Sequence, residues 1–231
     1  MIDPLTSGPN RIELMIWLSP TFPVGSFAYS HGLEAAVAVG AIGDRRQAED
    51  WLRDLLACGG PRNDSILLAA AWRVATAHDM AALAEVNDLA LALAGSRERH
   101  LETSAQGNAF MVTMLAAWDR PLQRRARAAI ADDFAYPVAV GIGAAAHGVE
   151  LLATLRGFTV AVVSTLCSAL VRLGVIGQTD AQRILAALMP DIIALADAAL
   201  HATLDDLGGA AFGSDLAAMA HETLDTRLFR S

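Results

Sequence analysis

The chain has 231 residues, 54% of them hydrophobic, and a formal net charge of −8 at pH 7. This acidic balance argues against nucleic-acid binding, because proteins that bind nucleic acids normally present a basic surface. All 17 of its lysine-plus-arginine residues are arginine. The missing lysine excludes a Walker A phosphate loop and Schiff-base catalysis.

The sequence shows no sign of export or of membrane insertion. Cys58 and Cys167 are far apart and belong to no paired motif, which is typical of a reducing cytoplasm. The amino end has no charged stretch followed by an apolar run, so no secretory signal is expected. The longest candidate span, residues 157–171, is shorter than the roughly 20 apolar residues that cross a bilayer. We therefore predict a cytoplasmic protein without a membrane segment, with residues 1–13 flexible.

The first distinctive segment is residues 19–34, which read SPTFPVGSFAYSHGLE. Its two prolines and two glycines favour turns, and its three aromatic residues carry large apolar surface. A segment of this kind is neither an ordinary core element nor an ordinary loop. It indicates a role in contacts.

The rest of the chain up to the carboxyl-terminal tail is predicted to be helical. Asp44 is a candidate N-cap, with Gln47 placed to complete a capping box. Thr179 and Gln182 suggest a second capping box, and Pro190 is expected to kink the helix that follows. The predicted helices cover residues 44–58, 63–77, 79–94, 96–118, a short basic stretch from 121, 136–148, 149–173 and 179–207.

The predicted fold class is therefore all-α. No period-2 pattern of β-branched residues is present to indicate strands. We expect a single domain over residues 1–231, a bundle of roughly eight to ten helices. A linker at residues 208–214 is expected to lead to a semi-detached, partner-docking tail at residues 214–231.

Residues 141–146 match the G-x-G-x-x-A form of a dinucleotide-binding fingerprint. That site needs a strand before the glycines and an acidic residue about 20 positions later, and neither is visible. Close packing between helices explains the glycines better. We predict no cofactor.

Histidine spacing also gives little support for a resident metal. None of the six histidines lies in an H-x-H, H-E-x-x-H or E-x-x-H motif. His31 and His221 remain candidates for transient metal ligation, although an interface or capping role is favoured for both. No nucleophile elbow and no recognisable catalytic group is present, so the chain is predicted not to be an enzyme.

The tail, residues 221–231, mixes apolar and basic side chains. Leu228 and Phe229 lie between Arg227 and Arg230. Large apolar side chains near a chain end are rarely left exposed, so the tail is predicted to dock in cis or onto a partner.

Several separated segments together resemble the urease accessory protein F family. They are S-P-x-x-P-V-G-x-F-x-Y-S-x-G-L-E at residues 19–34, G-Q-T-D-A-Q-R at 177–183, L-D-D-L-G at 204–208, and H-E-T followed by R-L-F-R-S at 221–231. The resemblance implies an all-α chaperone that helps to insert nickel into apo-urease. It also implies a homodimer that bridges accessory protein D (also called H) and the GTPase G.

The family pattern and the apolar pair in the tail define the predicted partner-binding residues, all of them hypotheses. An alternative role is regulation of the partner GTPase, for example through an arginine at Arg227 or Arg230. A third alternative is a metal carrier that uses His31 or His221. The predicted partner-binding residues are Tyr29, Ser30, Gly32, Glu34, His221, Glu222, Arg227, Leu228, Phe229 and Arg230.

Overall fold

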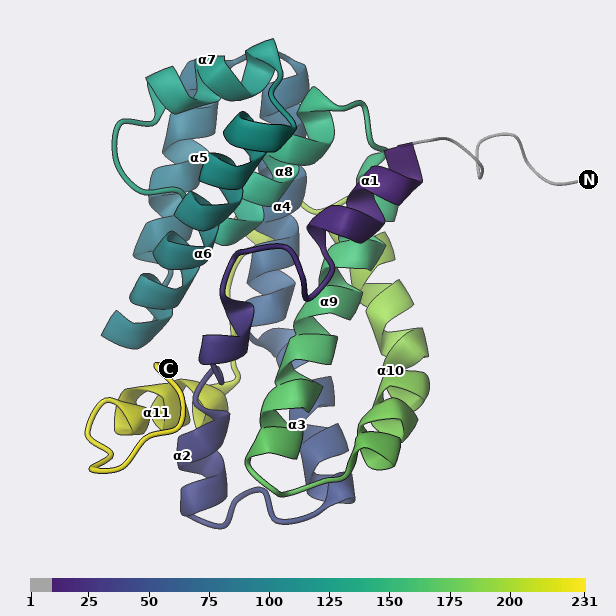
Figure 1. The fold of residues 1–231 in the computed structure, drawn as a ribbon, viewed down its shortest axis with the longest axis vertical. Coiled ribbons are helices and arrows are strands. Elements are labelled where there is room, and N and C mark those ends of the chain that lie inside the picture. Colours follow the sequence, from purple (N-terminus) through teal and green to yellow (C-terminus); the bar gives the residue numbers. More distant parts are fainter. Residues whose placement is uncertain (1–9) are drawn as a thin grey trace, which may run out of the picture.

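A computed structural model describes residues 10–231, which form helices without strands, as predicted (Figure 1). The expected flexibility of residues 1–9 lies outside the described residues, whereas residues 10–13 begin the first helix. The elements are α1 (Asn10–Trp17), η2 (Ser26–Ala28), α2 (Leu33–Ala38), α3 (Arg45–Cys58), α4 (Gly60–Thr76), α5 (Met80–Ala92), α6 (Arg97–Ala117), α7 (Pro121–Ala129), α8 (Tyr136–Ala146), α9 (Leu151–Arg172), α10 (Gln178–Ala199), η3 (Leu204–Asp206) and α11 (Phe212–His221).

Local sequence explains several helix boundaries. The Asp44 carboxylate accepts the Gln47 N–H at 2.8 Å and caps α3, as predicted. The Gln47 side chain accepts the N–H of Gly43 at 2.8 Å, one residue earlier than in a standard capping box. The Ser96 hydroxyl caps α6 by accepting the Arg99 N–H at 3.1 Å.

Helix α10 differs from the prediction at both ends. It begins after Gly177 without a side-chain cap, so the predicted capping box at Thr179 does not form. It ends at Ala199 rather than at residue 207, because the chain turns into η3. There the Asp206 carboxylate accepts the N–H of Thr203 at 2.8 Å and holds the turn.

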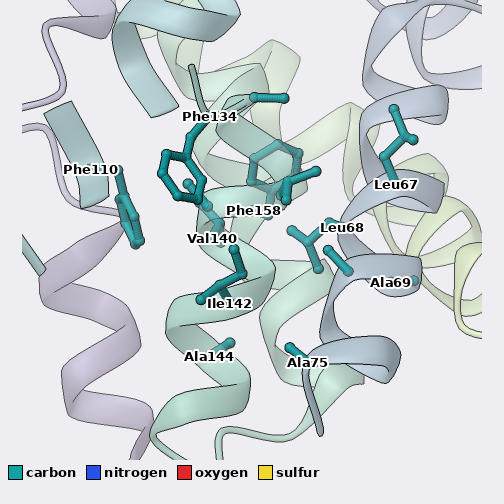
Figure 2. Packing of buried hydrophobic residues seen from close by; sticks show 14 of the residues in the cluster. Leu67, Leu68, Ala69, Ala75, Phe110, Phe134, Val140, Ile142, Ala144 and Phe158 are labelled. Atoms are coloured by element: carbon teal, nitrogen blue, oxygen red, sulfur yellow. The ribbon is translucent and has the colours of Figure 1, made fainter. Parts of the chain in front are cut away.

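Helix α8 is the centre of the larger hydrophobic cluster (Figure 2). Figure 2 shows Val140 and Ile142 of α8 between Phe110 of α6 and Leu68 of α4. A Cβ on Gly141 would lie 2.7 Å from the Leu68 carbonyl oxygen, so α8 and α4 pack more closely than any other residue would allow. The glycines of the apparent fingerprint therefore serve helix packing.

The second hydrophobic cluster lies among α2, α3, α10 and the second half of α9. Because α9 contributes to both clusters, the described chain forms one continuous core. Helix α9 spans 22 residues and is apolar and long enough to cross a membrane, unlike the shorter uncharged run considered above. Its apolar face instead packs against α10 and α4, as in a core helix of a globular protein.

The tail is not semi-detached. Helix α11 packs against α2 and α6, and the chain end returns beside α2 (Figure 1). His221, Phe229 and Ser231 are all buried. The short helices α1, α2 and α11 were not predicted, and all three lie in or beside the segments expected to make contacts.

Candidate functional site

The two distinctive end segments lie against each other. The Ser30 N–H donates to the Ser231 carbonyl at 2.8 Å, and the Arg230 N–H donates to the Ala28 carbonyl at 2.8 Å. The Ser30 hydroxyl also donates to the Ser231 carbonyl. We refer to residues 26–34, residues 221–231 and the first two turns of α6 together as the terminal junction. The tail therefore docks in cis.

Left-handed backbone brings the first segment into the terminal junction. His31 and Gly32 adopt φ values of 56° and 77°, which reverse the chain just before α2. A Cβ on Gly32 would lie 2.6 Å from the Ala218 backbone nitrogen of α11. Gly32 is therefore required both for its conformation and for the close approach of α11.

Glu34 joins α2 to the tail. Its two carboxylate oxygens accept the Leu228 N–H at 2.7 Å and the Phe229 N–H at 2.9 Å. One of them also lies 3.0 Å from Nε2 of His221. Burial raises the pKa of Glu34, but the hydrogen bonds from His221 and the two tail amides outweigh it, so the pKa is lowered overall.

His221 lies between two carboxylates. Its Nδ1 is 2.6 Å from Glu98 of α6, and its ring is completely buried. The other carboxylate oxygen of Glu98 accepts from Arg227 at 2.5 Å. Glu34 and Glu98 therefore face a guanidinium and an imidazole, and the four charges balance when the imidazole is protonated.

Glu102 is the second acidic centre, one turn after Glu98 on α6. Its carboxylate accepts from Arg99 at 2.5 Å and from the Ser231 hydroxyl at 2.9 Å, and it lies 2.8 Å from Nδ1 of His31. Burial alone would raise the pKa of Glu102. The opposing effect of Arg99 and His31 is larger, so the pKa is lowered from 4.5 to about 2. Glu102 is therefore a carboxylate that ties the tail, α6 and the first segment together.

The two candidate metal-binding histidines are held apart. His31 pairs with Glu102, whereas His221 uses both ring nitrogens on Glu34 and Glu98. Within residues 10–231, no group of three or more histidine, cysteine or acidic side chains is arranged to hold a metal ion. Both histidines make contacts within the chain, and their predicted interface or capping role stays a prediction.

The predicted partner-binding residues differ in exposure, with Glu34 partly buried and Arg227 exposed. Phe229 is only 4% exposed. The guanidinium carbon of Arg172 lies over its ring, 4.3 Å from the centre of that ring. Leu228 is 54% exposed, Arg230 is exposed, and the exposed Glu222 accepts the Arg97 N–H at 2.8 Å. The buried members are Tyr29, Ser30, Gly32, His221 and Phe229, and they hold the chain's own ends together.

Sequence reasoning missed the contribution of α6. Glu98 and Glu102 are four residues apart and therefore share one helix face, with Arg99 beside them. Both glutamates are largely buried although they lie in the charged stretch R-E-R-H-L-E. That spacing of acids in a helix start was the available signal, and only the fold shows that it meets the tail.

Two exposed apolar surfaces border this region. The first, the α11 surface, consists of Phe212, Leu216, Met219 and Leu228. The second, the α1 surface, consists of Ile12, Met15, Ile16, Phe27 and Val160. A pocket of about 440 Å³ lies between α1, η2 and α9. Its lining includes Met15, Phe27 and Val160 of the α1 surface and also His31, Arg99 and Glu102.

The comparisons with known proteins point to one family. The family model named UreF matches residues 42–189. A urease accessory protein UreF of Rhodopseudomonas palustris (strain HaA2) is 52% identical over 97% of this chain and 94% of its own length. Proteins of the same name from Xanthobacter autotrophicus and Methylorubrum populi are 51% and 48% identical, each over 96% of this chain and over 91% and 99% of their own lengths.

Proposed function

Because this chain belongs to the UreF family of urease accessory proteins, we propose that it is a non-catalytic adaptor in nickel insertion into apo-urease. In this role it bridges accessory protein D/H and the GTPase G. It acts as a homodimer in the cytoplasm. Its own side chains position partners rather than perform a reaction.

The observation that carries this proposal is the presence of two separate apolar surfaces on one small chain. Helices α1 and α11 lie apart in Figure 1, and the two surfaces approach each other only at the terminal junction, where Phe27 and Leu228 belong to adjoining segments. Exposed apolar side chains that gather in this way are typical of protein contacts. An adaptor needs two such surfaces, whereas a protein that only carries a small ligand does not.

Surface chemistry supports a different occupant for each surface. The α1 surface is the more apolar of the two, with the exposed Arg172 beside Phe27 at its edge, which suits a symmetric contact with a second copy of the chain. The α11 surface is bordered by exposed charges, including Asp215, Glu222 and Arg230. Mixed charge around an apolar centre favours a selective heterologous partner, and we assign this surface to accessory protein D/H.

Regulation of the partner GTPase is a second candidate function. Arg227 is committed to Glu98, and its loss would also unbalance the buried charges. Arg230 is exposed; its backbone N–H donates to Ala28, and its guanidinium interacts electrostatically with Tyr29. Arg230 is therefore the better candidate for an arginine that reaches a partner, which would change GTP turnover by about 10³- to 10⁵-fold.

The adaptor proposal is tested by substituting one exposed residue on each surface. We expect Leu216→Asp to reduce co-purification with D/H by at least about tenfold, because burying an unpaired charge opposes association. Met15→Asp should instead weaken self-association. Nickel-dependent urease activation, with D/H and G co-expressed, should fall in both variants.

Val112→Asp is the matched control, since Val112 on α6 is 68% exposed and Leu216 is 66% exposed. It should leave both complexes intact. Full D/H binding by Leu216→Asp would contradict the assignment of the α11 surface. If Arg230→Lys keeps every complex but lowers GTP turnover, the regulator function is supported over the purely passive adaptor.

A further inference from the structure

The starting point is the pocket of about 440 Å³ between α1, η2 and α9. Its volume falls within the roughly 300–1,000 Å³ of small-molecule binding sites. Most of its lining is apolar, and the rings of Tyr29, Tyr136 and Phe158 contribute to it. The rings of Tyr136 and Phe158 pack against each other with their centres 5.7 Å apart, and Tyr29 is buried. The fold therefore fixes the aromatic walls of the pocket before anything binds.

Asp64 of α4 lines the same pocket and is poorly paired. Its carboxylate lies 3.9 Å from Nη2 of Arg99, which is too far for a hydrogen bond, although the Asp64 side chain is only 23% exposed. Burial raises the pKa of Asp64, and the nearby positive charges of Arg99 and His31 offset this only in part. The Asp64 carboxyl group is therefore short of hydrogen-bond donors.

The charged donors that line the pocket are already used within the chain. Nη1 of Arg99 lies 2.5 Å from the Glu102 carboxylate and 2.8 Å from Nδ1 of His31. Arg172, which is exposed, donates to the Phe27 carbonyl. An anion that entered the pocket would have to displace one of these interactions before it found a partner.

The polar groups left unpaired in the pocket are acceptors. Within residues 10–231, no hydrogen bond involves the hydroxyl of Tyr29 or that of Tyr136, and both tyrosines line the pocket. Each hydroxyl oxygen can accept a hydrogen bond, and the ionised Asp64 carboxylate can only accept. Aromatic faces also attract cations. These features favour a cation that carries several N–H donors.

We propose that this pocket binds a small organic cation, which places a primary ammonium group beside Asp64 and an apolar body against Tyr136 and Phe158. This ligand site goes beyond the proposed adaptor function and is a property of the isolated chain. Met15 and Val160 line the pocket and also belong to the α1 surface. A second copy of the chain on that surface would therefore enclose the ligand.

The test is isothermal titration calorimetry on the full-length chain at neutral pH, with three probes of similar shape. Phenethylamine is the cation, phenethyl alcohol its neutral counterpart and phenylacetate the anion. We expect phenethylamine to bind with a dissociation constant of about 1 mM or below, as for other ligands of its size. Phenethyl alcohol should bind at least about fivefold more weakly, and phenylacetate more weakly still, because neither supplies a positive charge.

Two substitutions locate the site. Asp64→Asn removes the charge and keeps the shape of the side chain, so phenethylamine should bind at least about fivefold more weakly while phenethyl alcohol binds as before. Asp88→Asn on α5, an exposed residue, is the matched control. Ala161→Phe adds a ring inside the pocket and should abolish binding of both probes, whereas Ala187→Phe on the exposed face of α10 should not.

Equal affinity of the wild-type chain for phenethylamine and phenylacetate would overturn the proposal, and so would a failure to bind the amine. This comparison needs no variant, so it decides the question even if a substituted chain does not fold. Unchanged amine binding by folded Asp64→Asn and Ala161→Phe chains would also overturn it. No partner protein is present, so absence of amine binding together with loss of D/H binding by Leu216→Asp would leave the adaptor function standing without the ligand site.

Discussion

Helix α6 takes part in two regions that are stabilised in different ways. Its middle, with Phe110 and Met114, packs into the apolar core around α8. Its first two turns place Glu98 and Glu102 in the terminal junction, where charged hydrogen bonds dominate. One helix therefore joins a region held by apolar burial to a region held by paired charges.

The difference shows which region can change state. Core packing depends on shape, and it is lost only when the whole domain opens. The terminal junction depends on the ionisation of a few side chains, so pH can weaken it while the core stays folded. A chain end fixed in this way is ordered and still releasable.

The largest expected loss of stability comes from a substitution on the face of α6 that packs into the core. A Cβ on Gly107 would lie 2.0 Å from the Phe134 carbonyl oxygen, and main-chain atoms cannot move aside cheaply. Gly107→Ala should therefore lower the free energy of unfolding by at least about 3 kcal/mol. Urea unfolding measures the change, with Gly95→Ala, which meets no atom within 4 Å, as the control. A Gly107→Ala chain as stable as the wild type would mean that the regions differ less than described.

The next largest effect is expected at Glu102, in the terminal junction. Glu102, with its pKa at about 2, stabilises the fold above the usual carboxyl pKa near 4.5, and that contribution is lost as pH falls towards 2. It amounts to at most about 3 kcal/mol. Urea unfolding at several acidic pH values should show Glu102→Gln losing this acid sensitivity, whereas Glu85→Gln keeps it. Equal acid sensitivity in the two variants would show that Glu102 is not the group responsible.

The smallest effect on the free energy of unfolding is expected for an ion pair that lies outside both regions. Arg183 and Asp180 on α10 lie 2.8 Å apart, with the Arg183 side chain 65% exposed and the Asp180 side chain 35% exposed. Arg183→Gln should change the free energy of unfolding by less than about 0.5 kcal/mol, because solvent screens an exposed pair. Thermal unfolding at low and high salt checks this. A cost as large as that of Glu102→Gln would remove the distinction between buried and exposed charges.

The sequence predicted the long helices well because their signals are local. The Asp44 cap and the extents of α3 and α9, predicted as residues 44–58 and 149–173, follow from residues close together along the chain. The end of α10 was misplaced because its apolar spacing continued past Ala199, while the Asp206 turn that interrupts it depends on irregular backbone. The spacing of apolar residues along the chain does not predict a turn of this kind.

The candidate site was predicted only in part. Glu34, His221 and Arg227 were singled out through the family resemblance, but Glu98 and Glu102 were not. Their role depends on bringing residue 98 beside residue 221, which no spacing in the sequence encodes. For the same reason the tail was expected to be semi-detached, although its buried partners lie on α2 and α6.

The burial of Ser231 has a practical consequence for producing the protein. Its hydroxyl donates to Glu102, its carbonyl accepts from Ser30, and only 2% of the residue is exposed. Any residues joined after Ser231, such as an affinity tag, would have to leave from an enclosed point and would compete with these hydrogen bonds. Residues joined to Ser231 are therefore expected to undock the tail.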